Sequence, residues 1–117
     1  MSDATPAGGR WTASLHEILG HIEAGRTEQS WRYPIRHGTM RVGVYAPRGS
    51  DDQTPHTQDE LYIIISGEGW FRRGEERHRF APGDVLFVPA EMPHRFEEFA
   101  DDFATWVVFW GPEGGET

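Results

Sequence analysis

Near the start of the chain, apolar residues recur at the spacing of a helix. This apolar stripe consists of Leu15, Ile18, Leu19 and Ile22. A stripe at this spacing lies on one face of a helix and packs against a larger apolar body. Ser14 and Glu17 stand where a capping box satisfies the free backbone amides of a first turn. The pattern predicts a short helix over about residues 15–23.

Beyond residue 30 the period changes to two, which is typical of strands with two different faces. Turn residues such as Gly and Pro separate the apolar runs at regular intervals. Strands are predicted over residues 31–35, 40–45, 60–66, 70–72, 77–80, 84–88 and 103–110, and a further strand begins at His94. Segment 103–110 is apolar on both faces, so we expect it to be central or covered. The spacing predicts an all-β fold, an antiparallel barrel or double-sheet jelly roll with the helix outside it.

The length of 117 residues fits one domain. Apolar content of 37% with 13% aromatic residues is typical of a globular chain. Small and polar residues at both ends predict flexible tails over 1–13 and 113–117. We therefore expect a single domain over 14–112, with its core barrel over about 38–110.

Charge and missing residue types restrict the function. The net charge of −8 argues against nucleic acids and anionic membranes as partners. No apolar run approaches the roughly 20 residues of a membrane span, and we expect a cytoplasmic protein. The chain has no cysteine and no lysine, which excludes thiolate nucleophiles and Schiff-base lysines. Histidine, carboxylates and hydroxyls remain for chemistry.

The first candidate site lies in the stretch before strand 60–66. His56 and Glu60 are four positions apart, a distance of roughly 13 Å along one straight strand, too far to share a ligand. If residues 57–59 form a hairpin loop, the two become cross-strand neighbours with Cβ atoms about 5 Å apart. That separation suits two ligands of one metal ion.

A second stretch, GDVLFVPAEMPHRF over residues 83–96, completes a resemblance to the cupins, small β-barrels of the jelly-roll class. The first cupin motif is G-x5-H-x-H-x(3,4)-E-x6-G, and the second is G-x5-P-x-G-x2-H-x3-N. In the first, the second histidine, the glutamate and the final glycine are matched by His56, Glu60 and Gly67. In the second, the first glycine, the proline and the histidine are matched by Gly83, Pro89 and His94. The resemblance covers about residues 38–110 and implies a cupin barrel.

Several positions depart from these motifs. Thr54 stands where the first metal histidine would be, and Gly49 is one residue too close to it. Glu91 and Glu98 replace the glycine and the asparagine of the second motif. These changes leave the fold intact but alter the usual four-ligand metal shell.

The predicted metal ligands are His56, Glu60 and His94, a set that binds non-haem Fe(II) and leaves open positions. The same groups bind zinc, manganese or nickel, so the sequence predicts one divalent transition metal of unknown identity. Four residues are candidates for a further ligand or for the pocket wall, namely Thr54, Gln58, Tyr62 and Phe96. The alternative is a cupin without metal, in which Glu60 and the histidines form an ion-pair network. The sequence identifies no catalytic residue.

The resemblance implies two functional classes. One is a metal-dependent enzyme, a dioxygenase, isomerase or cyclase, that acts on a small organic molecule. The other is a non-catalytic barrel that binds a small molecule, with or without metal. The fold alone does not choose between them. On the outer face, Leu61, Ile63 and Ile65 need a cover, which predicts a homodimer.

Overall fold

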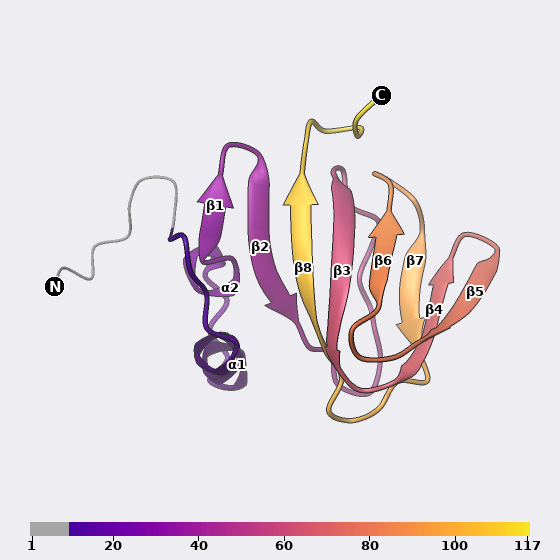
Figure 1. Ribbon diagram of the computed structural model, residues 1–117, viewed down its shortest axis with the longest axis horizontal. Helices are drawn as coiled ribbons and strands as arrows, with labels where there is room; N and C mark the ends of the chain where they lie inside the picture. Colours follow the sequence, from indigo (N-terminus) through magenta and orange to yellow (C-terminus); the bar gives the residue numbers. More distant parts are fainter. Residues whose placement is uncertain (1–9) are drawn as a thin grey trace, which may run out of the picture.

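The computed structural model describes residues 10–117, and within them the chain is mostly β-structure (Figure 1). Two helices come first, α1 (Leu15–Glu23) and α2 (Gln29–Arg32). The strands are β1 (Ile35–His37), β2 (Met40–Tyr45), β3 (Asp59–Ser66), β4 (Gly69–Arg73), β5 (Glu76–Phe80), β6 (Val85–Val88), β7 (His94–Glu97) and β8 (Ala104–Trp110).

The strands form two sheets that face each other. One has five strands in the order β1-β2-β8-β3-β6, and the other has three in the order β5-β4-β7. Every pair within the sheets is antiparallel. The core side chains between the sheets are Tyr62, Ile64, Phe71, Phe80, Val88, Phe96, Phe103, Val107 and Phe109. The predicted antiparallel jelly roll with a short N-terminal helix is confirmed.

The central strands follow the predicted alternation. Strand β8 lies between β2 and β3, which explains why it is apolar on both faces. On β3, Glu60, Tyr62 and Ile64 are buried, while Ile63 is 36% exposed on the opposite face. Beside it on β6, Val85 and Phe87 are 58% and 46% exposed. The outer face of β3 and β6 therefore carries an apolar patch of Ile63, Val85 and Phe87.

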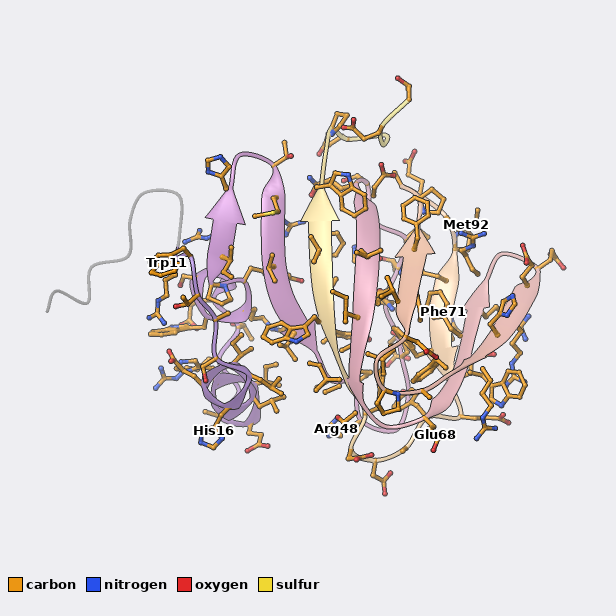
Figure 2. All side chains as sticks on the ribbon, viewed as in Figure 1. Trp11, His16, Arg48, Glu68, Phe71 and Met92 are labelled. Atoms are coloured by element: carbon orange, nitrogen blue, oxygen red, sulfur yellow. The ribbon has the colours of Figure 1, made fainter. Side chains whose placement is uncertain are left out.

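Helix α1 lies outside the sheets, beside α2 and β2 (Figure 1). The Ser14 hydroxyl accepts a hydrogen bond from the Glu17 backbone N–H at 3.3 Å, which confirms the Ser14 half of the predicted capping box, whereas the Glu17 carboxylate accepts from Arg10 at 3.2 Å. Ile18 is buried, whereas His16 projects away from the sheets at the far side of the helix (Figure 2). In residues 10–117, no helix has the length and apolarity needed to cross a membrane.

The prediction of a strand over 31–35 is wrong. The backbone N–H groups of Trp31 and Arg32 donate to the Glu28 carbonyl, which closes a helical turn. The strand begins only at Ile35, one residue after Pro34, because proline has no N–H to give to a sheet. Two aromatic residues raise the strand propensity of this segment, but the local turn decides its structure.

The predicted hairpin loop over 57–59 is also wrong. Asp59 is already part of β3, and His56 lies in the irregular segment before it. The carboxylate of Asp59 accepts hydrogen bonds from the backbone of Ala90 and of Glu116, each at 2.9 Å. The His56 carbonyl accepts one from the Glu91 N–H at 2.6 Å. The segment is thus held by the β6–β7 connection and the C-terminal residues, and does not fold back on itself.

The residues after β8 turn back toward the start of β3 (Figure 1). Gly114 N–H donates to the Thr57 carbonyl at 2.7 Å, close to the contact between Glu116 and Asp59. At the other end of the chain, Arg10 N–H donates to the Pro34 carbonyl at 2.9 Å. Residues 1–9 of the predicted N-terminal tail lie outside the described residues.

Candidate metal centre

Three structural elements bring the predicted ligands together. Glu60 points inward from β3, His94 is the first residue of β7, and His56 comes from the segment before β3. One ligand atom from each lies within 4.8 Å of the others. The two strands belong to different sheets, so the cluster lies between the sheets. The sequence was right about their proximity, although the predicted hairpin is not what produces it.

His94 and Glu60 form the buried part of the cluster. His94 Nδ1 donates to the Met92 carbonyl at 2.8 Å, which leaves Nε2 facing Glu60. Nε2 lies 3.0 Å from Glu60 Oε1, and each side chain is 1% exposed. Among residues 10–117, Oε1 has no partner with hydrogen-bond geometry. Two lone pairs at this distance repel, so a proton or a cation must lie between them.

His56 forms the more open part of the cluster. Its Nε2 lies 3.9 Å from Glu60 Oε2 and 3.2 Å from Gln53 Oε1. Its ring stands edge-on against Phe109, with 4.8 Å between ring centroids. The side chain is 35% exposed, so this imidazole faces the solvent side of the site.

Two loop residues beside the cluster, Gln53 and Asp51, were missed by sequence reasoning. The Tyr62 hydroxyl donates to Gln53 Oε1 at 3.2 Å and lies 3.2 Å from His94 Nε2. The Gln53 amide nitrogen donates to Asp51 Oδ2 at 2.8 Å. Asp51 is only 3% exposed and also accepts from the Phe96 N–H at 2.8 Å. Both residues lie in an irregular loop, where no hydrophobic period could have marked them.

Burial and charge shift the two histidines in opposite directions. Burial disfavours the imidazolium and lowers the pKa of His56, although the charge of Glu60 opposes this. For His94, burial also acts to lower the pKa, but the Glu60 carboxylate and the Met92 carbonyl outweigh it and raise the pKa. Burial, with the Glu60 charge acting in the same direction, raises the pKa of Tyr62 well above its usual range. Tyr62 therefore stays protonated at neutral pH.

A pocket of about 130 Å³ opens beside the cluster. It has room for several water molecules or a small organic molecule. Its walls are formed by Arg32, Tyr33, Val44, Tyr45, Gln53, His56, Glu60, Tyr62, Val107 and Phe109. A cluster of ionisable groups at the wall of a partly aromatic pocket is the usual composition of a small-molecule site.

Three of the four further candidates from the sequence, Thr54, Gln58 and Phe96, lie away from the cluster. Thr54 is exposed and does not line the pocket. The Gln58 amide faces away, because its oxygen accepts from Arg41 at 2.9 Å and its nitrogen donates to the Gly111 carbonyl at 2.9 Å. Phe96 is 1% exposed and belongs to the core. Of these four residues, only Tyr62 lies at the cluster.

Two departures from the cupin motifs show in the backbone. Glu91 has a φ of 64° and Glu98 a φ of 48°. This left-handed region favours glycine and, to a lesser degree, asparagine, which are the residues of the family motif at these two positions. The chain keeps the backbone of the motif even where it has changed the side chain.

The donor set fits a divalent transition metal. Two imidazoles and one carboxylate are a known ligand set for Fe(II), and the same groups bind Zn(II) or Mn(II). Glu60 Oε1 is a buried acceptor that lacks a hydrogen-bond partner among the described residues, and a cation would satisfy it. The hydrogen bond from His94 Nδ1 to Met92 is the second contact that a ligating histidine usually makes.

Comparison with known proteins agrees with this architecture. The family model Cupin_2, described as a cupin domain, matches residues 41–110. The uncharacterized protein SCO3923 of Streptomyces coelicolor is 37% identical over 99 residues, which are 81% of this chain and 94% of that protein. Dimethylsulfoniopropionate lyase DddQ of Ruegeria pomeroyi is 32% identical over 73 residues, which are 62% of this chain and 34% of the lyase.

Solved structures give the same result. The crystal structure of DddQ from Ruegeria pomeroyi matches with a TM-score of 0.58 at 30% identity, over 67% of this chain and 41% of the lyase. KdgF from Halomonas sp. has a TM-score of 0.58 at 15% identity, over 66% of this chain and 74% of KdgF, a likeness of fold alone. The chain spans less than half the length of the lyase in both comparisons. From its double-sheet fold and the matched domain, the chain belongs to the cupin family.

Proposed function

We propose that the protein is a metal-dependent enzyme that acts on a small organic molecule. The observation that carries the proposal is the buried Glu60 carboxylate. Its Oε1 lacks a hydrogen-bond partner among the described residues and faces His94 Nε2 at 3.0 Å, while Oε2 faces His56 Nε2 at 3.9 Å. A divalent cation held by these three residues would replace the repulsion between the carboxylate and imidazole lone pairs by attraction of both to the cation.

A bound metal would supply Lewis acidity or, if it is iron, redox chemistry. The chain's own groups then have separate roles. Tyr62 keeps its proton, because its pKa is raised, and donates it to Gln53 Oε1 at 3.2 Å, while its oxygen lies 3.2 Å from His94 Nε2. Its hydroxyl therefore acts as a fixed hydrogen-bond donor that orients the groups around the cluster. The rings of Tyr33 and Phe109 form an apolar part of the pocket wall.

We propose that the substrate carries an anionic group, such as a carboxylate. Arg32 lines the pocket, and it makes no ion pair with the other residues in 10–117. A guanidinium beside a small pocket is suited to bind a carboxylate through two parallel hydrogen bonds. The similarity to a protein named as a dimethylsulfoniopropionate lyase adds lyase chemistry to the oxygenase and isomerase classes.

The test is metal analysis followed by an activity screen. Protein purified without chelator is expected to contain one Fe, Mn, Ni or Zn ion per chain, measured by elemental analysis. His94→Ala is expected to lose the metal, whereas His78→Ala is the control, because the His78 side chain is 76% exposed. Loaded protein is then screened for O₂ uptake and for elimination from small carboxylates, dimethylsulfoniopropionate included. Absence of metal after incubation with all four ions would contradict the proposal.

One observation favours a second candidate, a metal-free barrel that binds a small molecule. The 3.0 Å distance between His94 Nε2 and Glu60 Oε1 is also compatible with a buried imidazolium–carboxylate pair, and so is the raised pKa of His94. Such a pair satisfies the same orphaned oxygen with a proton and needs no cation. Under this alternative the protein binds none of the four ions, and His94 remains protonated at neutral pH, which NMR of the ring would detect.

A further inference from the structure

We infer that Gln53 supplies a fourth protein ligand to the metal through its side-chain oxygen. This inference rests on the proposed function, since it requires that a metal binds. In the cupin motif that the chain resembles, a histidine would stand at position 54. Here the position is Thr54, whose exposed side chain does not line the pocket. The residue before it, Gln53, lines the pocket together with His56 and Glu60.

The Gln53 oxygen lies among the ligand atoms. Oε1 is 3.2 Å from His56 Nε2 and 3.2 Å from the Tyr62 hydroxyl. That hydroxyl is in turn 3.2 Å from His94 Nε2, which is 3.0 Å from Glu60 Oε1. Glu60 Oε2 lies 3.9 Å from His56 Nε2, so the polar atoms of these five side chains follow one another around a ring. An ion placed between the two imidazoles and the carboxylate would have the amide oxygen as its neighbour.

The orientation of the Gln53 amide is fixed by Asp51. A carboxylate only accepts hydrogen bonds, so the Gln53 nitrogen must face Asp51, to which it donates at 2.8 Å. The Gln53 backbone N–H also donates to Asp51, at 3.1 Å. Asp51 is itself held by the buried N–H of Phe96 at 2.8 Å. Turning the amide over would place carbonyl against carboxylate, so the oxygen is directed toward the cluster before any ligand arrives.

The chemistry of an amide oxygen suits this position. It is neutral, as imidazole is, so replacing a histidine by a glutamine leaves the charge of the ligand set unchanged. It is also a harder donor, which favours Mn(II) and Fe(II) over Cu(II) in comparison with a third imidazole. With this ligand set the site would prefer hard divalent transition ions.

The experiment compares metal binding by the wild type and three variants. Mn(II) and Co(II) dissociation constants are measured by calorimetry, and the visible absorption of the Co(II) form reports its coordination. Gln53→Ala removes the oxygen. Gln53→Asn keeps an amide but withdraws its oxygen by one methylene. Thr54→Ala is the control at the neighbouring exposed position. Thermal melting of each metal-free protein checks that it is folded.

We expect Gln53→Ala and Gln53→Asn to weaken binding about tenfold or more and to change the Co(II) spectrum, while Thr54→Ala leaves both unchanged. If Gln53→Ala does not fold, Gln53→Asn decides in the same way. Unchanged affinity in the Gln53 variants overturns the inference and leaves the metal site standing. Weaker binding with an unchanged Co(II) spectrum also overturns it, because Gln53 would then only position His56. Wild-type protein that binds neither ion refutes the proposed function and the inference together.

Discussion

Replacing Asp51 by asparagine should destabilise the metal-free protein markedly. Asp51 Oδ1 accepts from the Tyr45 hydroxyl and the Gln53 N–H, and Oδ2 accepts from the Gln53 amide and the Phe96 N–H. Asparagine has one oxygen and one NH₂ group, so in either orientation one pair of donors would face the NH₂ group. The Tyr45 hydroxyl or the Gln53 amide can turn to accept from it, but the backbone N–H of Gln53 or of Phe96 cannot. A buried group left without its hydrogen bond costs about 1–3 kcal/mol. For this one backbone N–H we expect a loss of about 1–3 kcal/mol in the free energy of unfolding.

Urea denaturation in the presence of a chelator measures this loss without a contribution from bound metal. On thermal melting the same change should lower the Tm by roughly 5–15 °C for a domain of this size. Asp52→Asn is the matched control, because Asp52 is exposed and the hydrogen bond that it accepts from Ser50 is 3.5 Å long. The control should stay within about 0.5 kcal/mol of wild type. If Asp51→Asn is as stable as this control, the network around Asp51 does not have the role described above.

Three further predictions concern the metal, the backbone and the outer face. Metal affinity should fall as the pH is lowered, because protonated imidazole cannot ligate. Since the pKa of His94 is raised above its usual 6.5, the loss of affinity should begin above pH 6.5. Constant affinity between about pH 8 and pH 5, measured by calorimetry, would argue against histidine ligation. Glu91→Gly should raise the free energy of unfolding by about 1 kcal/mol, because glycine relieves the left-handed backbone at a φ of 64°; a lower urea midpoint would contradict this. For the apolar patch of Ile63, Val85 and Phe87 we propose a second copy of the chain as cover, so light scattering should give about twice the chain mass of 13.3 kDa. Ile63→Glu should then give monomer or insoluble protein, and wild type measured as a monomer would refute the dimer.

The period of the side chains was sufficient to predict most strands. Strand β3 is the clearest case, since its inward Tyr62 and Ile64 and its outward Ile63 follow directly from alternation. The strand prediction for segment 31–35 was wrong because its aromatic residues favour a strand in isolation, while hydrogen bonds to the Glu28 carbonyl close a helical turn. Propensity is a property of single residues, and this turn depends on neighbours that carry no periodic signal.

The candidate site shows a similar division. Motif spacing identified His56, Glu60 and His94, because each occupies a fixed distance from a turn glycine or proline. Asp51 and Gln53 could not be found in this way. Their roles depend on how an irregular loop folds over the barrel, and a loop residue can face the solvent or the core with the same local sequence. The sequence thus predicted the three candidate ligands that cluster between the sheets, but not the loop residues that contact them.

The hydrogen bonds of Gln58 have a consequence for ligand binding. This side chain contacts Arg41, the Thr39 carbonyl and the Gly111 carbonyl, and so joins the β1–β2 turn, strand β2 and the end of β8 to the segment that carries His56. Ordering a free loop costs conformational entropy at the moment of binding. Here that entropy is lost when the barrel folds, so the segment is preorganised. A ligand at the proposed site would then bind without any large rearrangement of this segment.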